Sequence, residues 1–452
     1  MDFRHGVHMG IEQPIYLMGL DLGTSAIKGV VVDEQGNEVA AAEKRTTLEH
    51  PEEGWVESDP EQHYRDICEV IRDLVATAPG DVAALAMSAA SGNTLLTDGD
   101  GRPLTPIISW MDQRAAQNLP NALKTLSAKA VHQISGWPCV DQFPLAHLAW
   151  LRENRGDLFR AAEHCGMNTD WILFRLTGNW IMDHSTATTF LLQDQVTGSY
   201  HPPFLNLLDI PEESLSPLAD SGVLAGALTR EAARDTGLSV GTAVITGCFD
   251  HPSAARSVNV VEPGTLMLSC GTSWVGFFPE MDREKIIDAG LLCDPFLTEH
   301  GGPWGAIFSV PYIGRAIDWY VDNVIALGKS DRLRIFDDSA AEASPGAGGL
   351  QIDLREPPRK IAASRCDISR AVMEGAATLL NGKIQELAAR GMRFEGAVMV
   401  GGPSRSPVWP GIVGEITGLK LSVGSAHAGA QGAAILAGEG IGICKNEQEI
   451  RL

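Results

Sequence analysis

The chain opens with short apolar segments that are separated by polar turns. Residues 15–20 are apolar and partly β-branched, and residues 27–32 repeat this pattern, so both segments predict buried strands. Residues 33–37 carry Asp, Gly and Asn and form a strong turn signal. A helix is predicted from Pro60 to about residue 78, because Asp59 precedes a proline and apolar residues then recur at helical spacing. This alternation of strands and helices is typical of an α/β protein.

The later pattern predicts further elements of both kinds. Strands are expected at residues 83–90, 243–247 and 396–400, and helices at 145–180, 311–327, 367–391 and 430–437. Asp367 is the expected cap of its helix, and the Ala, Gly and Pro of residues 342–349 predict a loop. Residues 98–101 (Asp-Gly-Asp-Gly) resemble part of a calcium loop, but the downstream Glu is missing, so a hairpin turn is the preferred interpretation.

Two copies of one small turn stand far apart in the chain. Gly23-Thr24-Ser25 and Gly271-Thr272-Ser273 each lie between two apolar runs, which gives the order strand, turn, strand. Glycine allows backbone N–H groups to come close to a ligand, and the two hydroxyls add further donors, so each turn is a candidate anion site. A Walker loop or a dinucleotide fold requires strand, glycine-rich turn, helix, and the chain contains no G-x-x-x-x-G-K-[ST].

Charged residues flank the first turn. Asp21 precedes it, where a carboxylate would repel a phosphate unless a cation lay between them, and Lys28 follows it. This arrangement indicates Mg²⁺, held by Asp21 through water. The alternative interpretation of each turn is an ordinary hairpin corner. The repeat and the flanking charges favour phosphate binding, with one phosphate chain held between two related halves.

Composition limits the classes of partner. The net charge of −22 argues against nucleic acids and acidic membranes as partners. The eight cysteines include no C-x-x-C pair, as expected of reduced thiols in a cytoplasmic protein. No apolar stretch reaches the length of a membrane span, and the first 14 residues lack the apolar core of a signal peptide. The chain of 452 residues is long enough for two or three domains.

Four ordered segments carry a resemblance to a known family. They are the first turn with its flanking Asp21 and Lys28, then Gly247-Cys248-Phe249-Asp250, the second turn, and Gly401-Gly402-Pro403-Ser404-Arg405-Ser406-Pro407 with Trp409. Weaker support comes from Trp55-Val56-Glu57-Ser58-Asp59-Pro60, Trp110-Met111-Asp112-Gln113-Arg114 and Arg175-Leu176-Thr177-Gly178. In this order the segments resemble the FGGY family of carbohydrate kinases, from about residue 15 to residue 442.

The resemblance implies an α/β fold of two actin-like, ribonuclease H-like domains with ATP and sugar in the cleft between them. The expected domains are 15–246, for the acceptor and the first hairpin, and 247–442, for ATP. The resemblance further implies that both hairpins hold the phosphates, that Gly401 and Gly402 lie against the adenosine with Ser406 in support, and that Asp250 is the general base. Asp250 also precedes His251-Pro252, so local sequence alone favours a helix cap, and the two roles are compatible.

The acceptor side departs from the family pattern. Ser91-Gly92-Asn93 stands where relatives of the resembled family carry larger sugar-contacting residues, and His251 replaces an Asn or Gln after the base. An imidazole at this position can bond a substrate hydroxyl or meet the carboxylate of an acidic sugar. Each of these positions also has a purely structural interpretation. Further acceptor contacts are expected from these residues: Trp110, Asp112, Asp141 and Gln142.

The preferred function is ATP- and Mg²⁺-dependent phosphorylation of a small sugar, polyol or sugar acid. The alternative is a catalytically altered, nucleotide-binding sensor or scaffold on the same fold, since the acceptor loop is changed. The second half is also shorter than in the resembled family before Asp367. That segment often shapes a dimer surface, so both a monomer and a homodimer are compatible with the sequence.

Overall fold

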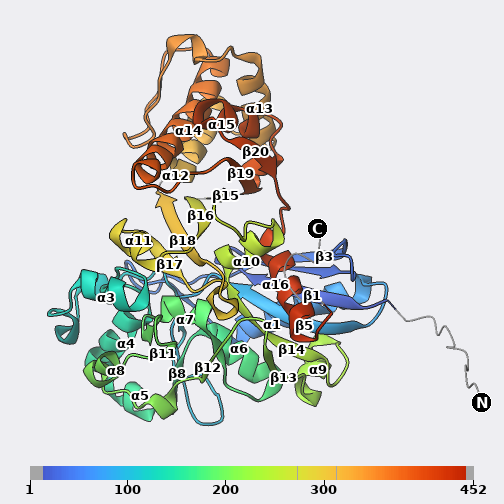
Figure 1. The fold of residues 1–452 in the computed structure, drawn as a ribbon, viewed down its shortest axis with the longest axis vertical. Helices are drawn as coiled ribbons and strands as arrows, with labels where there is room; N and C mark the ends of the chain where they lie inside the picture. Colours follow the sequence, from blue (N-terminus) through green and yellow to red (C-terminus); the bar gives the residue numbers. More distant parts are fainter. Residues whose placement is uncertain (1–13, 272, 312, 444–452) are drawn as a thin grey trace, which may run out of the picture.

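The computed structural model describes residues 14–271, 273–311 and 313–443, and its framework is a pair of six-stranded sheets, one above the other in Figure 1. The first sheet has the order β13 (Leu224–Ala227), β14 (Ala243–Phe249), β5 (Val82–Ala89), β1 (Tyr16–Leu22), β2 (Ala26–Val32), β3 (Glu38–Arg45). The second sheet has the order β17 (Leu292–Asp294), β18 (Trp304–Val310), β16 (Trp274–Glu280), β15 (Thr265–Cys270), β19 (Gly396–Gly401), β20 (Lys420–Val423).

The centres of the two sheets share one plan. In the first sheet β1 pairs antiparallel with β2 and parallel with β5. In the second, β15 pairs antiparallel with β16 and parallel with β19. Each Gly-Thr-Ser turn therefore closes the central hairpin of its own sheet, and the predicted order of strand, turn, strand is confirmed for the first turn. Thr272, in the second turn, lies outside the described residues.

The first predicted helix is confirmed as α1 (Pro60–Thr77). The Asp59 carboxylate accepts a hydrogen bond from the Gln62 N–H at 2.7 Å, which satisfies a free donor of the first turn. Its apolar face, with Ile67, Ile71 and Leu74, is fully buried against the first sheet. The predicted turn at residues 98–101 is also present, since the Gly101 N–H donates to the Asp98 carbonyl.

The segment predicted as helical over residues 145–180 is divided. It contains α4 (Phe143–Asn154), α5 (Gly156–Ala161) and α6 (Asn168–Thr177), but β8 (His164–Gly166) interrupts them. β8 pairs antiparallel with β6 (Leu95–Thr97), which is remote in sequence. Helical periodicity in a single segment cannot reveal such a distant pairing, and this explains the error.

The second half is largely helical beyond its sheet. The helix predicted at 311–327 is α12 (Ile313–Tyr320) followed by a π-helical turn (Val321–Ile325), and α13 (Arg332–Glu342) precedes the predicted loop. The long helix α14 (Arg365–Ala389) is capped by Ser364, whose hydroxyl accepts from the Asp367 N–H at 3.0 Å. The prediction of Asp367 as the cap was therefore wrong by one turn, because a second capping residue stands just before it.

The final helix returns to the first sheet. α16 (Ala428–Gly440) packs on β1 and β5 and against α10 (Asp250–Ser257), as Figure 1 shows between the two sheets. The contact is very close. A Cβ added to Gly19 would lie 1.8 Å from the Ala430 carbonyl oxygen, and one added to Gly432 would lie 1.8 Å from that of Ser253. Small residues are therefore required here on strand and helix alike.

The remaining elements surround this framework. They are β4 (Glu57–Ser58), β7 (Ile107–Ile108), α2 (Arg114–Gln117), α3 (Ala128–Ser135), β9 (Met182–Asp183), α7 (His184–Phe190), β10 (Gln193–Asp194), β11 (Ser199–Tyr200), α8 (Pro202–Leu208), β12 (Leu218–Ala219), α9 (Arg230–Thr236), α11 (Arg283–Asp288) and α15 (Trp409–Thr417). One buried apolar cluster joins Phe249 of the first sheet with Phe277 and Phe296 of the second half. The core is therefore continuous across the junction between the sheets.

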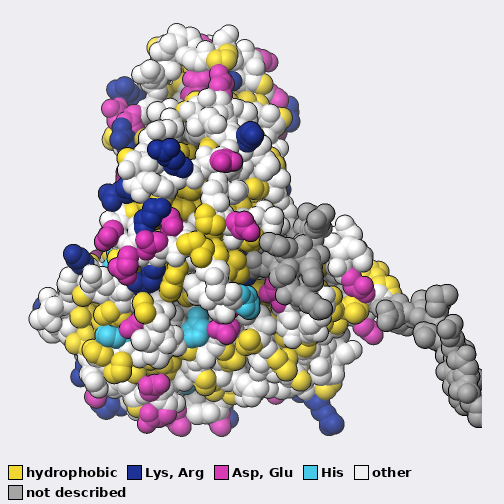
Figure 2. All heavy atoms as spheres, viewed as in Figure 1, with side chains coloured by type: hydrophobic (Ala, Val, Ile, Leu, Met, Phe, Trp, Pro, Cys, Tyr) yellow, Lys and Arg dark blue, Asp and Glu magenta, His cyan; other side chains and the backbone are white. Residues whose placement is uncertain are grey.

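The face of the molecule drawn in Figure 2 carries charges of both signs. Lys and Arg side chains lie close to Asp and Glu side chains on this face and form no continuous basic band. This face therefore offers no extended basic surface for an acidic partner.

Candidate active site

Two carboxylates meet where the first sheet faces the second half of the chain. Asp21 lies at the end of β1, directly opposite Lys28 in the β1–β2 hairpin. The Ser88 hydroxyl donates to Asp21 Oδ1 at 3.3 Å. Burial, and next the negative charge of Asp250, raise the pKa of Asp21 to about 7, although Lys28 and Ser88 act in the opposite direction. The two carboxylates are therefore close enough to repel each other.

Asp250 lies at the start of a helix, but it is not the N-cap residue of that helix. It is the first residue of α10, and this helix receives no side-chain cap from its N-cap residue Phe249. Asp250 Oδ1 is buried and has no hydrogen-bond partner among the described residues. Burial raises the pKa of Asp250, while His251, whose Nδ1 lies 3.7 Å from Oδ1, acts to lower it. A hydrogen bond with the His251 backbone also acts to lower the pKa of Asp250. Asp250 is therefore the first helical residue of α10, and Phe249 occupies the N-cap position.

This pair of carboxylates fits a divalent cation. Mutual repulsion and an unpartnered buried oxygen are both relieved when a cation lies between the groups. No cluster of three or more His, Cys, Asp or Glu side chains suited to a metal occurs in the described ranges. A cation here would accordingly take most of its ligands from water and phosphate, as Mg²⁺ commonly does in phosphoryl-transfer sites.

The first hairpin is firmly supported by its neighbours. Thr24 Oγ1 accepts a hydrogen bond from the Trp110 indole at 2.9 Å, and the Thr24 carbonyl accepts one from the Thr46 hydroxyl at 2.5 Å. A Cβ on Gly23 would lie 2.8 Å from the Ala26 carbonyl oxygen, so the turn requires glycine. Ser25 is exposed at the tip. The turn is therefore held in place by Trp110 and Thr46, and it presents the exposed Ser25 at its tip.

The second hairpin lies beside the Gly401-Gly402 segment. Cys270 pairs with Gly401 in adjacent strands. Gly401 has φ of 91°, and a Cβ there would lie 2.6 Å from the Cys270 carbonyl oxygen, so only glycine fits. Gly271 and Gly402 are both exposed. The two segments predicted to hold ATP are thus brought together by strand pairing.

Two further residues of this region have a supporting position. The Gly271 N–H donates to the Ser273 carbonyl at 3.2 Å and closes the turn. Ser406 Oγ accepts hydrogen bonds from the backbone N–H groups of Val408 and Trp409, both at 3.2 Å. Ser406 therefore fixes the start of α15 behind the glycine segment.

The acceptor loop is packed against aromatic side chains. Gly92 has φ of 91°, and a Cβ there would lie 2.4 Å from the Phe143 ring and 3.4 Å from Trp110 Cβ. Ser91 is buried, and its hydroxyl accepts from Thr189 Oγ1 at 2.9 Å. The absence of a side chain at residue 92 thus leaves space that Phe143 fills.

Asn93 is a positioning residue in this loop. Its Oδ1 accepts from the Trp110 backbone N–H at 3.0 Å. Its Nδ2 donates to the Ala90 carbonyl at 3.3 Å and to Asn168 Oδ1 at 3.1 Å. The Asn93 amide is consequently engaged with the protein itself and orients Trp110.

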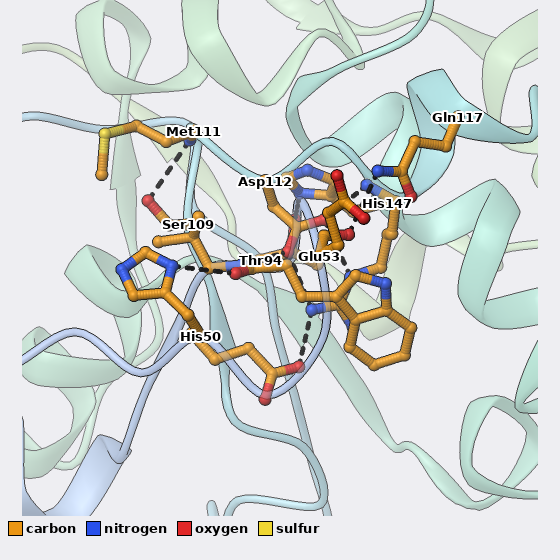
Figure 3. A network of polar contacts seen from close by, with 12 residues as sticks. His50, Glu53, Thr94, Ser109, Met111, Asp112, Gln117 and His147 are labelled. Atoms are coloured by element: carbon orange, nitrogen blue, oxygen red, sulfur yellow. Dashed lines mark hydrogen bonds and ion pairs between the residues drawn. The ribbon is translucent and has the colours of Figure 1, made fainter.

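Asp112 belongs to the network of polar contacts drawn in Figure 3. Its carboxylate is fully buried and accepts from the Val56 N–H at 2.7 Å and from Arg114 Nε at 2.8 Å. Arg114 also bonds Glu57 at 2.6 Å and lies 3.8 Å above the Trp55 ring. The Trp55 and Trp110 segments thus meet through Arg114, and Asp112 holds the loop that carries Trp110.

A row of aromatic rings connects the segment of Asp141 and Gln142 with His251. Phe143 contacts Trp137, Trp137 contacts Phe249, and Phe249 contacts His251, with ring centroids 5.4, 5.8 and 5.3 Å apart. Asp141 and Gln142 directly precede Phe143; Asp141 is exposed. Sequence reasoning missed Trp137, Phe143 and Phe249 as a group, since three isolated aromatic residues give no local signal.

Comparison with known proteins gives the family. The model of the N-terminal domain of the FGGY family of carbohydrate kinases matches residues 16–256, and that of the C-terminal domain matches residues 339–440. The chain is 28% identical to the autoinducer-2 kinase of Salmonella choleraesuis (strain SC-B67), over 96% of this chain and 87% of that protein.

Solved structures show the same fold. Gluconate kinase from Lactobacillus acidophilus superposes with a TM-score of 0.85 at 22% identity, covering 97% of this chain and 92% of that chain. Xylulose kinase from Rhodospirillum rubrum superposes with a TM-score of 0.80 at 24% identity, covering 95% and 91%. No helix within the described residues is long and apolar enough to cross a membrane. The chain belongs to the FGGY family of carbohydrate kinases and has the two-domain, actin-like (ribonuclease H-like) α/β fold of that family.

Proposed function

We propose that Asp250 is the general base in transfer of the γ-phosphoryl group of ATP to a hydroxyl of a small sugar, polyol or sugar acid. The observation that carries this role is the buried Asp250 Oδ1, which has no partner among the described residues. Such an oxygen is free to accept the proton of a substrate hydroxyl. Burial raises the pKa of Asp250, which makes the carboxylate a stronger base than an exposed one.

Asp21 has a different role in this proposal. It lies beside Lys28 at the first hairpin, and the charge of Asp250 helps to raise its pKa. We assign Asp21 to Mg²⁺, through water, and the exposed Ser25 with the Gly23 and Thr24 backbone to the phosphates. The cation would neutralise charge on the phosphates during transfer. Lys28 adds a positive charge on the same hairpin.

The second half is proposed to hold the nucleotide. Gly271, Thr272 and Ser273 would bind phosphate oxygens, and Gly401 and Gly402 would lie against the adenosine. Pairing of Cys270 with Gly401 supports this division, because it places both segments at the carboxyl ends of two adjacent strands, β15 and β19. We accordingly propose domains 15–246 and 247–442, with acceptor and nucleotide on opposite sides of the cleft. The last strand of the first sheet ends at Phe249, near this boundary.

The acceptor is proposed to lie against Trp110, between the first hairpin and the base. The Trp110 indole touches Thr24, and Asn93 and Asp112 hold its loop in place. His251, Gln142 and Asp141 are the polar side chains proposed to bond acceptor hydroxyls. Similar proteins are named for autoinducer-2, gluconate and xylulose, so these three compounds head the panel of acceptors to be tested.

We further propose a reducing, cytoplasmic location, with a monomer or homodimer as the assembly. All seven cysteines in the described residues are free, and five of them are buried. Unpaired buried thiols are typical of proteins from reducing compartments.

The test is release of ADP by the purified protein with Mg·ATP and a panel of ketoses, polyols and aldonates. We expect ADP release that depends on one acceptor, and a loss of about 10²- to 10⁴-fold in kcat for Asp250→Asn with ATP affinity retained. Asp100→Asn, at an exposed turn, is the matched control and should keep full activity. Nucleotide binding without acceptor-dependent turnover would favour the sensor or scaffold, and unchanged turnover in Asp250→Asn would remove that residue from its role.

A further inference from the structure

Strand β17 of the second sheet forms hydrogen bonds with residues of the first half of the chain. The Cys293 N–H in β17 donates to the Gly136 carbonyl at 3.0 Å, and Gln195 Nε2 donates to the Cys293 carbonyl at 2.9 Å. His132 Nε2 donates to the Leu291 carbonyl at 2.7 Å. The end of β17 is therefore held by the first half and lies next to α7 and the end of β14.

A chain of hydrogen bonds runs from this strand to the residue before the base. Ser185, in the first turn of α7, donates its hydroxyl proton to Asp294 Oδ2 at 2.8 Å. The same hydroxyl oxygen accepts the Phe249 backbone N–H at 3.1 Å. Ser185 and Asp294 are 2% and 0% exposed, so water does not compete for these bonds. Phe249 is covalently linked to Asp250.

The polarity of this chain depends on the carboxylate. Asp294 Oδ1 accepts the Phe296 N–H at 2.8 Å, so both of its oxygens act as acceptors. Because the Ser185 hydroxyl donates its hydrogen bond to Asp294 Oδ2, its oxygen is available to accept the hydrogen bond from the Phe249 N–H. An asparagine at residue 294 has one acceptor and one donor end, so it cannot accept from both the hydroxyl and the Phe296 amide.

The same loop of the second half also holds the far end of α10. Arg256 Nη2 donates to the Phe296 carbonyl at 2.7 Å, and its guanidinium lies 5.0 Å from the Phe296 ring centroid. Arg256 lies on α10, well after Asp250. Residues 294–296 thus contact α10 near both of its ends. Asp294 is linked to Phe249, just before the helix, through Ser185, and Phe296 bonds Arg256 near the end of the helix.

Helix α7 also reaches the acceptor loop. Thr189, one turn beyond Ser185 on α7, donates to Ser91 Oγ at 2.9 Å. One short helix therefore contacts the strand end that precedes the base, the second-sheet strand β17 and the loop of residues 91–93.

We propose that Ser185 and Asp294 are positioning residues that fix the base against the acceptor. The pair sets the backbone at Phe249, and through it the direction of the Asp250 side chain, and it links this direction to the second half of the chain. The proposal rests on the proposed role of Asp250 as the base. Neither residue touches the reacting groups, so their loss should lower kcat and leave binding of both substrates nearly unchanged.

The experiment compares Ser185→Ala and Asp294→Asn with a matched control, Ser216→Ala. Ser216 donates to Asp170 Oδ2 at 2.6 Å, and both residues are 0% exposed, so the control removes an equally buried Ser–Asp bond elsewhere in the first half. Each variant is measured for its unfolding midpoint, for kcat and both KM values, and for hydrogen exchange of peptides that resolve the Phe249 amide.

For Ser185→Ala and Asp294→Asn we expect kcat to fall about 10- to 100-fold, KM for ATP and acceptor to stay within about twofold, and the Phe249 amide to exchange faster. Ser216→Ala should lose a similar amount of stability but keep its kcat and its Phe249 protection. Equal kcat in all three variants, or an unchanged Phe249 exchange rate, would overturn the proposal. A wild-type protein without kinase activity would refute the proposed function. Exchange of the Phe249 amide can be measured without turnover, so it would still show whether Ser185 and Asp294 hold the Phe249 backbone.

Discussion

The two Gly-Thr-Ser hairpins have the same turn residues but different surroundings. Asp21 stands two residues before Gly23 in the first, and Ser269 stands two residues before Gly271 in the second. The first turn is held from outside by Trp110 and Thr46. Among the described residues of the second turn, the Gly271 N–H donates to the Ser273 carbonyl, and the preceding Cys270 pairs with Gly401. The two turns thus share their turn residues, whereas the flanking residues differ in charge: Asp21 is charged and Ser269 is neutral.

The strands behind the two turns differ as well. Gly19 in β1 allows α16 to approach within contact of the backbone, whereas Met267 occupies the corresponding place in β15 and is fully buried in an apolar cluster. Gly19 leaves room for the backbone of α16 on the first sheet. At the corresponding position of the second sheet, the Met267 side chain fills that space and packs in an apolar cluster. The first hairpin thus carries charged residues and close helix packing, whereas the second carries neutral residues and apolar packing.

The largest expected effect is a difference in kcat between a variant of the charged first hairpin and a variant of the neutral second hairpin. Asp21→Asn should lower kcat at least about 100-fold, because it removes the charge that we propose acts on the cation and phosphates. Ser269→Ala, at the corresponding place, should lower kcat less than about 10-fold. Steady-state assays over a range of Mg²⁺ concentrations measure both. Equal losses in the two variants would contradict an asymmetric site.

The next effect concerns the packing of α16. Gly19→Ala should destabilise the fold by about 1–3 kcal/mol or more, because the new Cβ would lie 1.8 Å from the Ala430 carbonyl oxygen. Met267→Leu preserves volume and should cost less than about 1.5 kcal/mol. Urea unfolding followed by tryptophan fluorescence gives both values. A harmless Gly19→Ala would show that α16 does not lie as close to β1 as described.

A smaller effect tests the external support of the first hairpin. Trp110→Phe removes the indole N–H that bonds Thr24, at a cost of about 1 kcal/mol, or about fivefold in kcat/KM. The matched change is Trp274→Phe beside the second hairpin, where the buried indole N–H has no partner in the described part of the chain. Kinase assays should show little change in kcat/KM for that variant. The reverse order would indicate that the second hairpin is the one supported from outside.

The smallest effect is a pH dependence of stability. Burial and Asp250 raise the pKa of Asp21 to about 7, so the folded chain holds a proton that the unfolded chain releases near pH 4. The charged Asp21 therefore costs stability that is absent below about pH 4 and is fully present above about pH 7. Without Mg²⁺, Asp21→Asn should raise the melting temperature at pH 8 and leave it unchanged at pH 4, by differential scanning fluorimetry. A constant difference at both pH values would contradict this sign.

Much of the fold could be predicted from local patterns. The strands at residues 16–22, 26–32 and 396–401 and the helix at 60–77 correspond to the predicted segments, because each carries its own periodicity and its own start or stop signals. The division of residues 145–180 could not be predicted, since β8 exists only through pairing with β6. The cap at Ser364 was missed because two suitable residues lie close together, and only the backbone dihedral angles distinguish them.

The candidate site divides in the same way. The turns, Asp21, Lys28 and Asp250 could be named from the sequence, since glycine and charge at fixed spacings have a direct chemical meaning. Asp112 and Asn93 could be named, but not their contacts: both are bound to the protein itself and hold Trp110 in place. Ser185 and Asp294 gave no signal at all, because an isolated Ser and an isolated Asp have no pattern until folding brings them within 2.8 Å.

The sequence by itself determined the reaction family, the repeated Gly-Thr-Ser turn and the sign of the charges around it, since these depend on residue type and on spacing along the chain. Only the tertiary structure decided that Asp250 Oδ1 is buried without a hydrogen-bond partner among the described residues, that Gly401 lies beside Cys270, and that α16 returns to β1. The physical reason is that burial, pKa and hydrogen-bond partners are set by residues far apart in sequence, and a periodic pattern carries no information about which distant segment will cover it.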